Sequence, residues 1–245
     1  MWFEQFRKNE KAQKICRVLC KIYDDTVLIL CVLLLLIGAY TVYDDYMLFY
    51  HAQDRSLLKY KPGLDSGNND GEKVFTNGYV AWLTIDDTSI DYPVMQGTDN
   101  STFLNMDPYG EYSLSGSIFL DTRNTSDFSD NYNLLYGHHM ENKYMFGALD
   151  DYLKKSFFDA HRNGKLIVIS EGEKSYDLKI FAVMDTTSRS QAFEPNEKDI
   201  TFEFIRENAQ IYYDPVHTNS RILAMSTCQS AETTGRLIVF AEIIN

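Results

Sequence analysis

The 245-residue chain has room for one medium-sized domain and an additional segment, and it is too short for two full domains. Its composition, 44% hydrophobic and 24% charged, indicates neither a disordered chain nor a repeat array. The net charge is −12, and the part that follows residue 25 carries −14, because Lys and Arg outnumber Asp and Glu before that point. Such an acidic body would repel phosphates, which argues against a nucleic-acid-binding protein.

The first predicted element is a membrane-spanning helix over residues 26–43. These 18 consecutive residues carry no charge, and 18 helical residues nearly cross a hydrocarbon core of about 30 Å. A buried core helix normally keeps a polar face. A cleaved signal peptide has a shorter apolar run and a small-residue cleavage site, and no such site precedes Asp44 and Asp45. We therefore predict an uncleaved, single-pass signal anchor in the cell membrane.

The basic segment 1–25 is expected in the cytoplasm, because positive charge remains on that side of a membrane. Residues 44–73 then form a juxtamembrane helix, over 44–62, and a linker rich in Gly, Asn and Asp, over 63–72. Residues 74–245 are predicted to form one extracellular domain.

Short runs of β-branched and aromatic residues, separated by turn signals, recur throughout that domain. They number eight, which favours an all-β barrel or sandwich. The eight predicted strands are 78–85, 89–95, 116–121, 132–138, 165–170, 176–187, 221–228 and 236–244. Apolar stripes predict two helices, over 145–161 and 197–213. The predicted fold class is mostly β with helices (α+β): a β-barrel decorated by helices, preceded by N-terminal helices and the anchor.

Four cysteines divide unequally between the two parts. Cys16, Cys20 and Cys31 lie in or beside the anchor, which leaves Cys228 alone in the exterior domain. A lone exterior cysteine has no intramolecular disulfide partner, and an unpaired thiol outside the cell is exposed to oxidation. Most free cysteines are simply small buried hydrophobic residues, and the count by itself favours that interpretation. Cys16 and Cys20 have no histidine or second pair near them, so they do not indicate a zinc site.

Three chemical groups lie at the ends of predicted strands. Cys228 ends one strand, His138 ends another within the segment YGHHM, and Arg236 opens the last strand eight residues after Cys228. That spacing fits a hairpin, which would bring Arg236 back beside Cys228. A nearby guanidinium favours the thiolate and stabilises an oxyanion, and histidine transfers protons near neutral pH. The residues by themselves predict a thiol acyl-transfer enzyme outside the cell.

The same segments resemble the sortase family, class B type. The stretch STCQSAETTGR resembles the sortase signature, and YGHHM is similar to the histidine motif of class B members. GYVAWLTIDDTSIDYPVMQGTDN and GSIFLDTRN resemble the early strands of that class. The resemblance extends from about residue 74 to the end of the chain, and implies an eight-stranded sortase-like barrel.

The resemblance implies a role for each residue. Cys228 would be the nucleophile, His138 the general acid and base, and Arg236 the partner of the oxyanion and substrate carbonyl. Ser226 and Thr227 would contact substrate, Ser226 from the same strand face as Cys228. His139, next to His138, would point elsewhere and serve a structural role, and His51, His161 and His217 belong to no motif.

The implied reaction cuts a C-terminal sorting signal of N-P-x-T-x type in a secreted protein through a thioacyl intermediate. The product is then transferred to a peptidoglycan amine of the cell wall. Three alternatives stay open: a class B sortase that joins pilin subunits through a lysine, a secreted cysteine hydrolase, and an inactive binding module on the same barrel. No cofactor or metal is expected.

Overall fold

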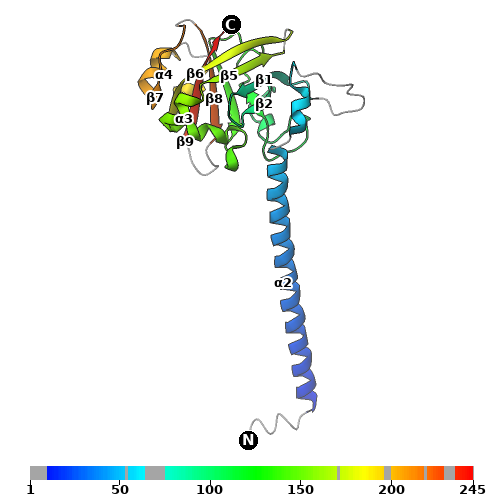
Figure 1. The fold of residues 1–245 in the computed structure, drawn as a ribbon. Coiled ribbons are helices and arrows are strands. Elements are labelled where there is room, and N and C mark those ends of the chain that lie inside the picture. Colours follow the sequence, from blue (N-terminus) through cyan, green and yellow to red (C-terminus); the bar gives the residue numbers. More distant parts are fainter. Residues whose placement is uncertain are drawn as a thin grey trace. The chain divides into compact units, whose positions relative to one another are not determined.

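The computed structural model describes residues 10–52, 55–63, 75–169, 172–195, 200–217, 220–228 and 235–244. The chain divides into two units, residues 1–48 and residues 49–245. A single helix forms the described part of the first unit, and a β-barrel with short helices forms the second (Figure 1).

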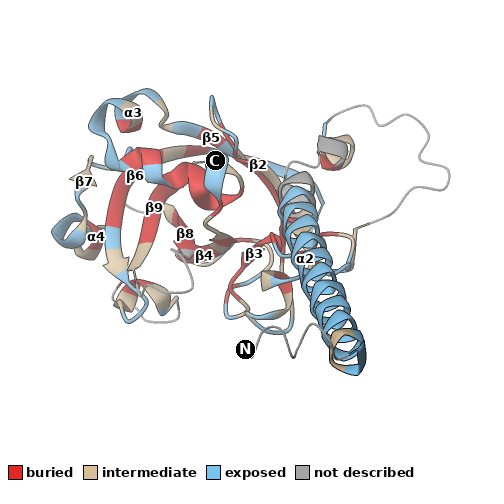
Figure 2. Ribbon diagram, turned by 90° about the horizontal axis from the view of Figure 1, so that it is seen from below, coloured by how far each residue is buried: buried red, intermediate tan, exposed pale blue. Residues whose placement is uncertain are grey.

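The helix α2 (Glu10–Ala52) is continuous through the predicted membrane segment 26–43. Its span Glu10–Met47 is the one helix among the described residues that is long and apolar enough to cross a membrane. None of its apolar window is buried by protein, and Figure 2 shows exposed residues along its length. It is therefore not a core helix, and its surface suits a lipid environment. The predicted juxtamembrane helix consists of the last turns of α2 and the 3-10 helix η1 (Arg55–Tyr60), and most of the predicted linker lies outside the described residues.

Eight strands of the second unit form a closed barrel in the order β5, β1, β2, β3, β4, β8, β9, β6, and β6 pairs with β5 to close the ring. The pairs β2–β3 and β4–β8 are parallel, and the other barrel pairs are antiparallel. All eight predicted strands are barrel strands, which confirms the predicted fold. Their bounds are β1 (Tyr79–Ile85), β2 (Asp91–Met95), β3 (Ile118–Leu120), β4 (Tyr132–His138), β5 (Asn163–Val168), β6 (Lys174–Thr187), β8 (Arg221–Cys228) and β9 (Gly235–Ile244).

The predicted helix over 197–213 is shorter than expected. The structure has α4 (Phe202–Asn208) and then a two-residue strand, β7 (Ile211–Tyr212), that pairs with β6 outside the ring. Backbone hydrogen bonds from Gln210 and Tyr213 to β6 carbonyls hold this strand. An open backbone edge on β6 therefore prevailed over the helical pattern of the sequence.

The predicted helix over 145–161 is also divided. It consists of the 3-10 helix η4 (Phe146–Leu153) and the short α3 (Lys155–Ala160), separated by Lys154 in an extended conformation. Before η4, Met145 has a positive φ of 50°. Gly147 lies so close to the carbonyl of Met140 that an added Cβ would be 2.0 Å from that oxygen. These tertiary contacts determine the backbone where the apolar stripe alone predicted an uninterrupted helix. The remaining 3-10 helices are η2 (Thr102–Leu104), η3 (Glu141–Lys143) and η5 (Gln191–Phe193).

The strands β4, β8 and β9 are covered on both faces, and Figure 2 shows them as largely buried. On one face, alternate residues of these strands form a core cluster with Ala192 of η5 and Ile205 of α4. The strand residues of this cluster are Tyr132, Leu134, Ile222, Ala224, Ile238 and Phe240. The 3-10 helix η4 also packs against the three strands. Near its start, an added Cβ on Gly137 would be 2.7 Å from the ring of Phe146, so only glycine fits there.

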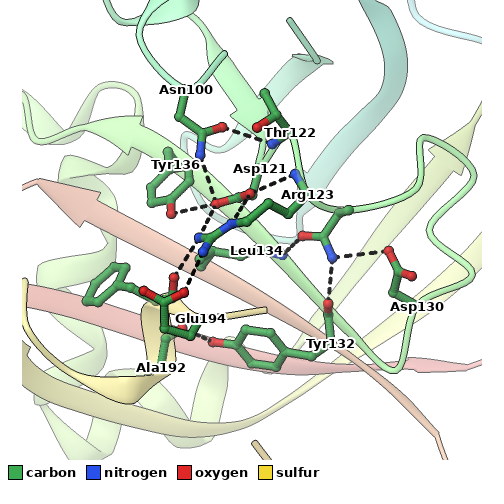
Figure 3. Close-up of polar contacts among 12 residues, drawn as sticks. Asn100, Asp121, Thr122, Arg123, Asp130, Tyr132, Leu134, Tyr136, Ala192 and Glu194 are labelled. Atoms are coloured by element: carbon green, nitrogen blue, oxygen red, sulfur yellow. Dashed lines mark hydrogen bonds and ion pairs between the residues drawn. The ribbon is translucent and has the colours of Figure 1, made fainter. Parts of the chain in front are cut away.

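A buried carboxylate holds the turn between β3 and β4 (Figure 3). Asp121 is 0% exposed and accepts hydrogen bonds from the guanidinium of Arg123, the hydroxyl of Tyr136 and the amide of Asn100. Burial by itself would raise the pKa of Asp121, but these hydrogen bonds outweigh it and the pKa is lowered. The ionised carboxylate is thus the form that the fold stabilises.

We predict that Asp121→Asn lowers the free energy of unfolding by about 3 kcal/mol at pH 7, because it leaves the Arg123 cation without its buried partner. Since the folded pKa is lowered, the contribution is present above the ordinary carboxyl pKa of about 4 and is lost as the pH falls through the folded value. Urea unfolding of both proteins at pH 7 and pH 3 measures this. A variant as stable as wild type at pH 7, or an unchanged difference at pH 3, would contradict the role of the carboxylate.

Candidate active site

The backbone brings the three predicted catalytic positions to one level on adjacent strands. His138 on β4 is in register with Cys228 on β8, and Cys228 is in register with Arg236 on β9. Neighbouring strands lie about 4.8 Å apart, and residues opposite each other share a face of the sheet. The hairpin predicted from the spacing of Cys228 and Arg236 is therefore present. His138, far earlier in the chain, completes the row.

The half-buried side chain of His138 is held by a loop backbone. Its Nε2 lies 2.7 Å from the carbonyl oxygen of Leu104, the last residue of η2. Because a carbonyl oxygen only accepts hydrogen bonds, Nε2 carries the proton in this arrangement. Nδ1 is then the basic nitrogen of the neutral ring. An imidazole oriented in this way can exchange a proton through Nδ1 while its ring plane stays fixed.

Arg236 occupies the other side of Cys228 in the register. It is half-buried, and its Nη1 donates a 2.8 Å hydrogen bond to the carbonyl of Gly235. Thr186, near the end of β6, is its register neighbour on the far side. Position 228 thus lies between an acid–base group and a permanent cation, which is the arrangement that activates a thiol and stabilises an oxyanion.

Ser226 and Thr227, the predicted substrate contacts, are both 0% exposed. Neither hydroxyl has a hydrogen-bond partner among the described residues. Ser226 is in register with Tyr136 and Ile238, so it shares the face of the catalytic row. Thr227 alternates to the opposite face, which separates it from that row. A contact of Ser226 with substrate stays a prediction and requires movement of whatever covers it.

The neighbouring histidine has a different environment, in accordance with its predicted structural role. The Nε2 of His139 lies 2.6 Å from a carboxylate oxygen of Asp150 in η4. His161 and His217, which belong to no motif, contact the Phe157 carbonyl and the Glu242 carboxylate. Within the described ranges, no group of three or more His, Cys, Asp or Glu side chains could hold a metal ion.

Sequence reasoning missed the residues that surround the row. Tyr136 lies two residues before His138 on the same strand face, and its hydroxyl is bound to Asp121. Burial, followed by the nearby negative charge of Asp121, raises its pKa, so the phenol stays protonated. Arg123 connects the same carboxylate to η5 (Figure 3). The signal of this network in the sequence was the polar DTRN stretch, residues 121–124, after a predicted strand.

Comparisons with known proteins agree with this geometry. The family model described as "Sortase domain" matches residues 83–244. Sortase B of Staphylococcus aureus (strain NCTC 8325 / PS 47) is 37% identical over 67% of this chain and 70% of that protein. Sortase B of Listeria monocytogenes (serovar 1/2a, strain ATCC BAA-679 / EGD-e) is 34% identical over 67% of this chain and 69% of its own.

Solved structures lead to the same class. A Streptococcus pyogenes class B sortase involved in pilus biogenesis aligns with a TM-score of 0.62 and 40% identity, over 69% of this chain and 94% of that chain. A Staphylococcus aureus sortase B–substrate complex aligns with a TM-score of 0.63 and 33% identity, over 70% of this chain and 82% of that one. With a thiol position set between a histidine and an arginine on a closed barrel, the chain belongs to the sortase family and is a class B sortase, a cysteine transpeptidase.

Proposed function

We propose that Cys228 is the nucleophile, His138 the general acid and base, and Arg236 the group that stabilises the oxyanion. The observation that carries the proposal is the shared register of the three positions on β4, β8 and β9. A row of this kind places a base and a cation on either side of one thiol, and parallel and antiparallel neighbours hold it rigidly.

The substrate is a secreted protein with a C-terminal sorting signal of N-P-x-T-x type. The Cys228 thiolate attacks the carbonyl carbon that follows Thr, and Arg236 stabilises the negative charge on its oxygen. The C–N bond breaks, His138 protonates the leaving amine, and a thioester remains on Cys228. An incoming amine, deprotonated by His138, then attacks the thioester carbon, and Cys228 leaves as the thiolate.

The acceptor is a peptidoglycan amine of the cell wall. Similar solved structures support an amine acceptor, since one is of sortase B complexed with triglycine and another is of a sortase B–substrate complex. A second candidate is a lysine of a pilin subunit. The observation that favours it is the 40% identity to a class B sortase involved in pilus biogenesis, which this chain covers over 94% of its length.

The sorting signal and the acceptor are tested together by mass spectrometry. We expect a thioacyl adduct on Cys228 after mixing with an N-P-x-T-x peptide, its absence in Cys228→Ala, and an amide product when triglycine is added. Competition between triglycine and a lysine peptide distinguishes the two acceptors. An adduct that only hydrolyses, whichever amine is present, would indicate a cysteine hydrolase. A thiol that neither reacts with peptide nor is alkylated would indicate a binding module.

Arg236→Lys is expected to lower kcat/KM on the order of 100-fold, because an ammonium does not reproduce the planar fork of donors at the oxyanion. Steady-state kinetics with the same peptide measure the change. Arg162→Lys is a matched control, since Arg162 also donates to a carbonyl, that of Ile180, outside the catalytic row. Activity of Arg236→Lys within a few-fold of wild type would remove Arg236 from the mechanism.

We also propose that α2 anchors the enzyme as a single span, with residues 1–25 in the cytoplasm, 26–43 in the membrane, 44–73 as the juxtamembrane segment and 74–245 outside. The excess of Lys and Arg before residue 26 supports this orientation. Added protease should digest the barrel on intact protoplasts and leave a tag at residue 1 untouched. A tag digested before lysis would reverse the orientation, and a mature protein that lacks residues 1–43 would show cleavage instead of anchoring.

A further inference from the structure

The segment that leaves β6 forms a cover beside the catalytic row. β6 ends at Thr187, whose neighbour Thr186 is in register with Arg236, and the chain then turns into η5. Ala192 of η5 packs with the residues of β4, β8 and β9 that share the face of the row, and Phe193 packs against that cluster. The ring of Phe193 is stacked at 10° to the ring of Tyr136, at a centroid distance of 6.4 Å. A peptide with its reacting carbonyl at Cys228 lies next to this cover.

Short 3-10 helices have few internal hydrogen bonds, so external contacts determine their position. Two backbone carbonyls of this cover are held from the β3–β4 side of the barrel. The hydroxyl of Tyr132 donates to the Ala192 carbonyl at 2.8 Å, and Nη2 of Arg123 donates to the Phe193 carbonyl at 2.7 Å. Nη1 of Arg123 also pairs with the carboxylate of Glu194 at 2.6 Å. Arg123 therefore binds two consecutive residues at the end of η5 (Figure 3).

The guanidinium itself is fixed from behind. Its Nε and Nη2 each donate a 2.9 Å hydrogen bond to the two oxygens of Asp121, which is fully buried. The same Asp121 carboxylate accepts the hydroxyl of Tyr136, two residues before His138. The hydrogen bonds and charge of Asp121 raise the pKa of Arg123, so it stays a cation. A bidentate pair of this kind orients the planar fork, which a lysine would not do.

We propose that Arg123 is a positioning residue that holds η5 at a fixed distance from Tyr136 and thereby sets how tightly the class B sortase binds its sorting peptide. Arg123 acts through Phe193 and Glu194 and not on the reacting atoms. This inference rests on the proposed peptide substrate for its kinetic consequence. Its structural part, the fixed position of η5, does not depend on the identity of the substrate.

Two variants separate positioning from direct contact with substrate. Arg123→Lys keeps the charge and loses the fork, whereas Glu194→Gln leaves Arg123 in place and removes only its charged partner on the cover. Because the Glu194 side chain is 55% exposed, this second variant is expected to fold normally. Arg221→Lys is the matched control. Arg221 also donates to a backbone carbonyl, that of Phe128 at 2.9 Å, but from the opposite end of β8.

The kinetic experiment uses the full chain in detergent with a fluorogenic N-P-x-T-x peptide and triglycine. We expect KM for the peptide to rise about tenfold in Arg123→Lys and about threefold in Glu194→Gln, with kcat within about threefold of wild type. The rate of alkylation of Cys228 by iodoacetamide, followed by mass spectrometry, should be unchanged in both. Wild-type KM in Arg123→Lys, or a raised KM in Arg123→Lys together with wild-type KM in Glu194→Gln, would overturn the positioning role.

Hydrogen exchange of residues 188–195 provides the second readout. Positioning predicts faster exchange there in both variants and unchanged exchange in Arg221→Lys. If the wild-type enzyme forms no amide product, the proposed function fails, and the exchange data alone still decide whether Arg123 fixes η5. Equal exchange in wild type and Arg123→Lys would refute the inference whatever the activity.

Discussion

The parallel pairing of β4 with β8 is the constraint on which the rest of the structure depends. It joins residues 132–138 to residues 221–228 through seven matched positions. These strands lie far apart in the chain, so no turn determines their register. What determines it is burial on both faces, since a shift by one residue would exchange the residues packed on η5 and α4 with those on the opposite face. The same register that fills the core also sets His138 opposite Cys228.

Carboxylates that face the barrel hold its peripheral segments in place. Asp121 binds the β3–β4 turn and, through Arg123, the end of η5. Asp91 on β2 accepts hydrogen bonds from Lys61, which follows η1, and from the indole of Trp82. Glu242 on β9, fully buried, accepts the backbone amides of Val216 and His217 and the hydroxyl of Ser220. A strongly acidic chain thus uses some of its negative charge as internal acceptors, where each is matched by several donors.

This arrangement gives the catalytic row a rigid side and an adjustable side. The strands that carry His138, Cys228 and Arg236 are held by ladders on both sides of β8. The cover formed by η5 is held by side chains from elsewhere in the barrel. Rigid support of reacting groups and separate control of the substrate-facing segment are compatible demands, because they are carried by different interactions.

The local patterns of the chain were sufficient for all eight barrel strands, because half-buried strands alternate and end at turn residues whatever their partners are. They also identified the apolar helix, whose composition alone determines its environment. The hairpin between Cys228 and Arg236 was visible because its eight-residue spacing is local. The pattern was misleading over 145–161 and 197–213, where contacts with Met140 and with the β6 edge decided the backbone.

The sequence by itself determined the type of each strand, the apolar anchor and the identity of the three chemical groups. Only the tertiary structure decided that β4 lies beside β8, that Thr227 lies on the opposite face from the row, and that Arg123 reaches Glu194. The physical reason is that these contacts join residues about 70 to 90 positions apart. Their free energy comes from packing and from buried hydrogen bonds, neither of which leaves a periodic signal along the chain.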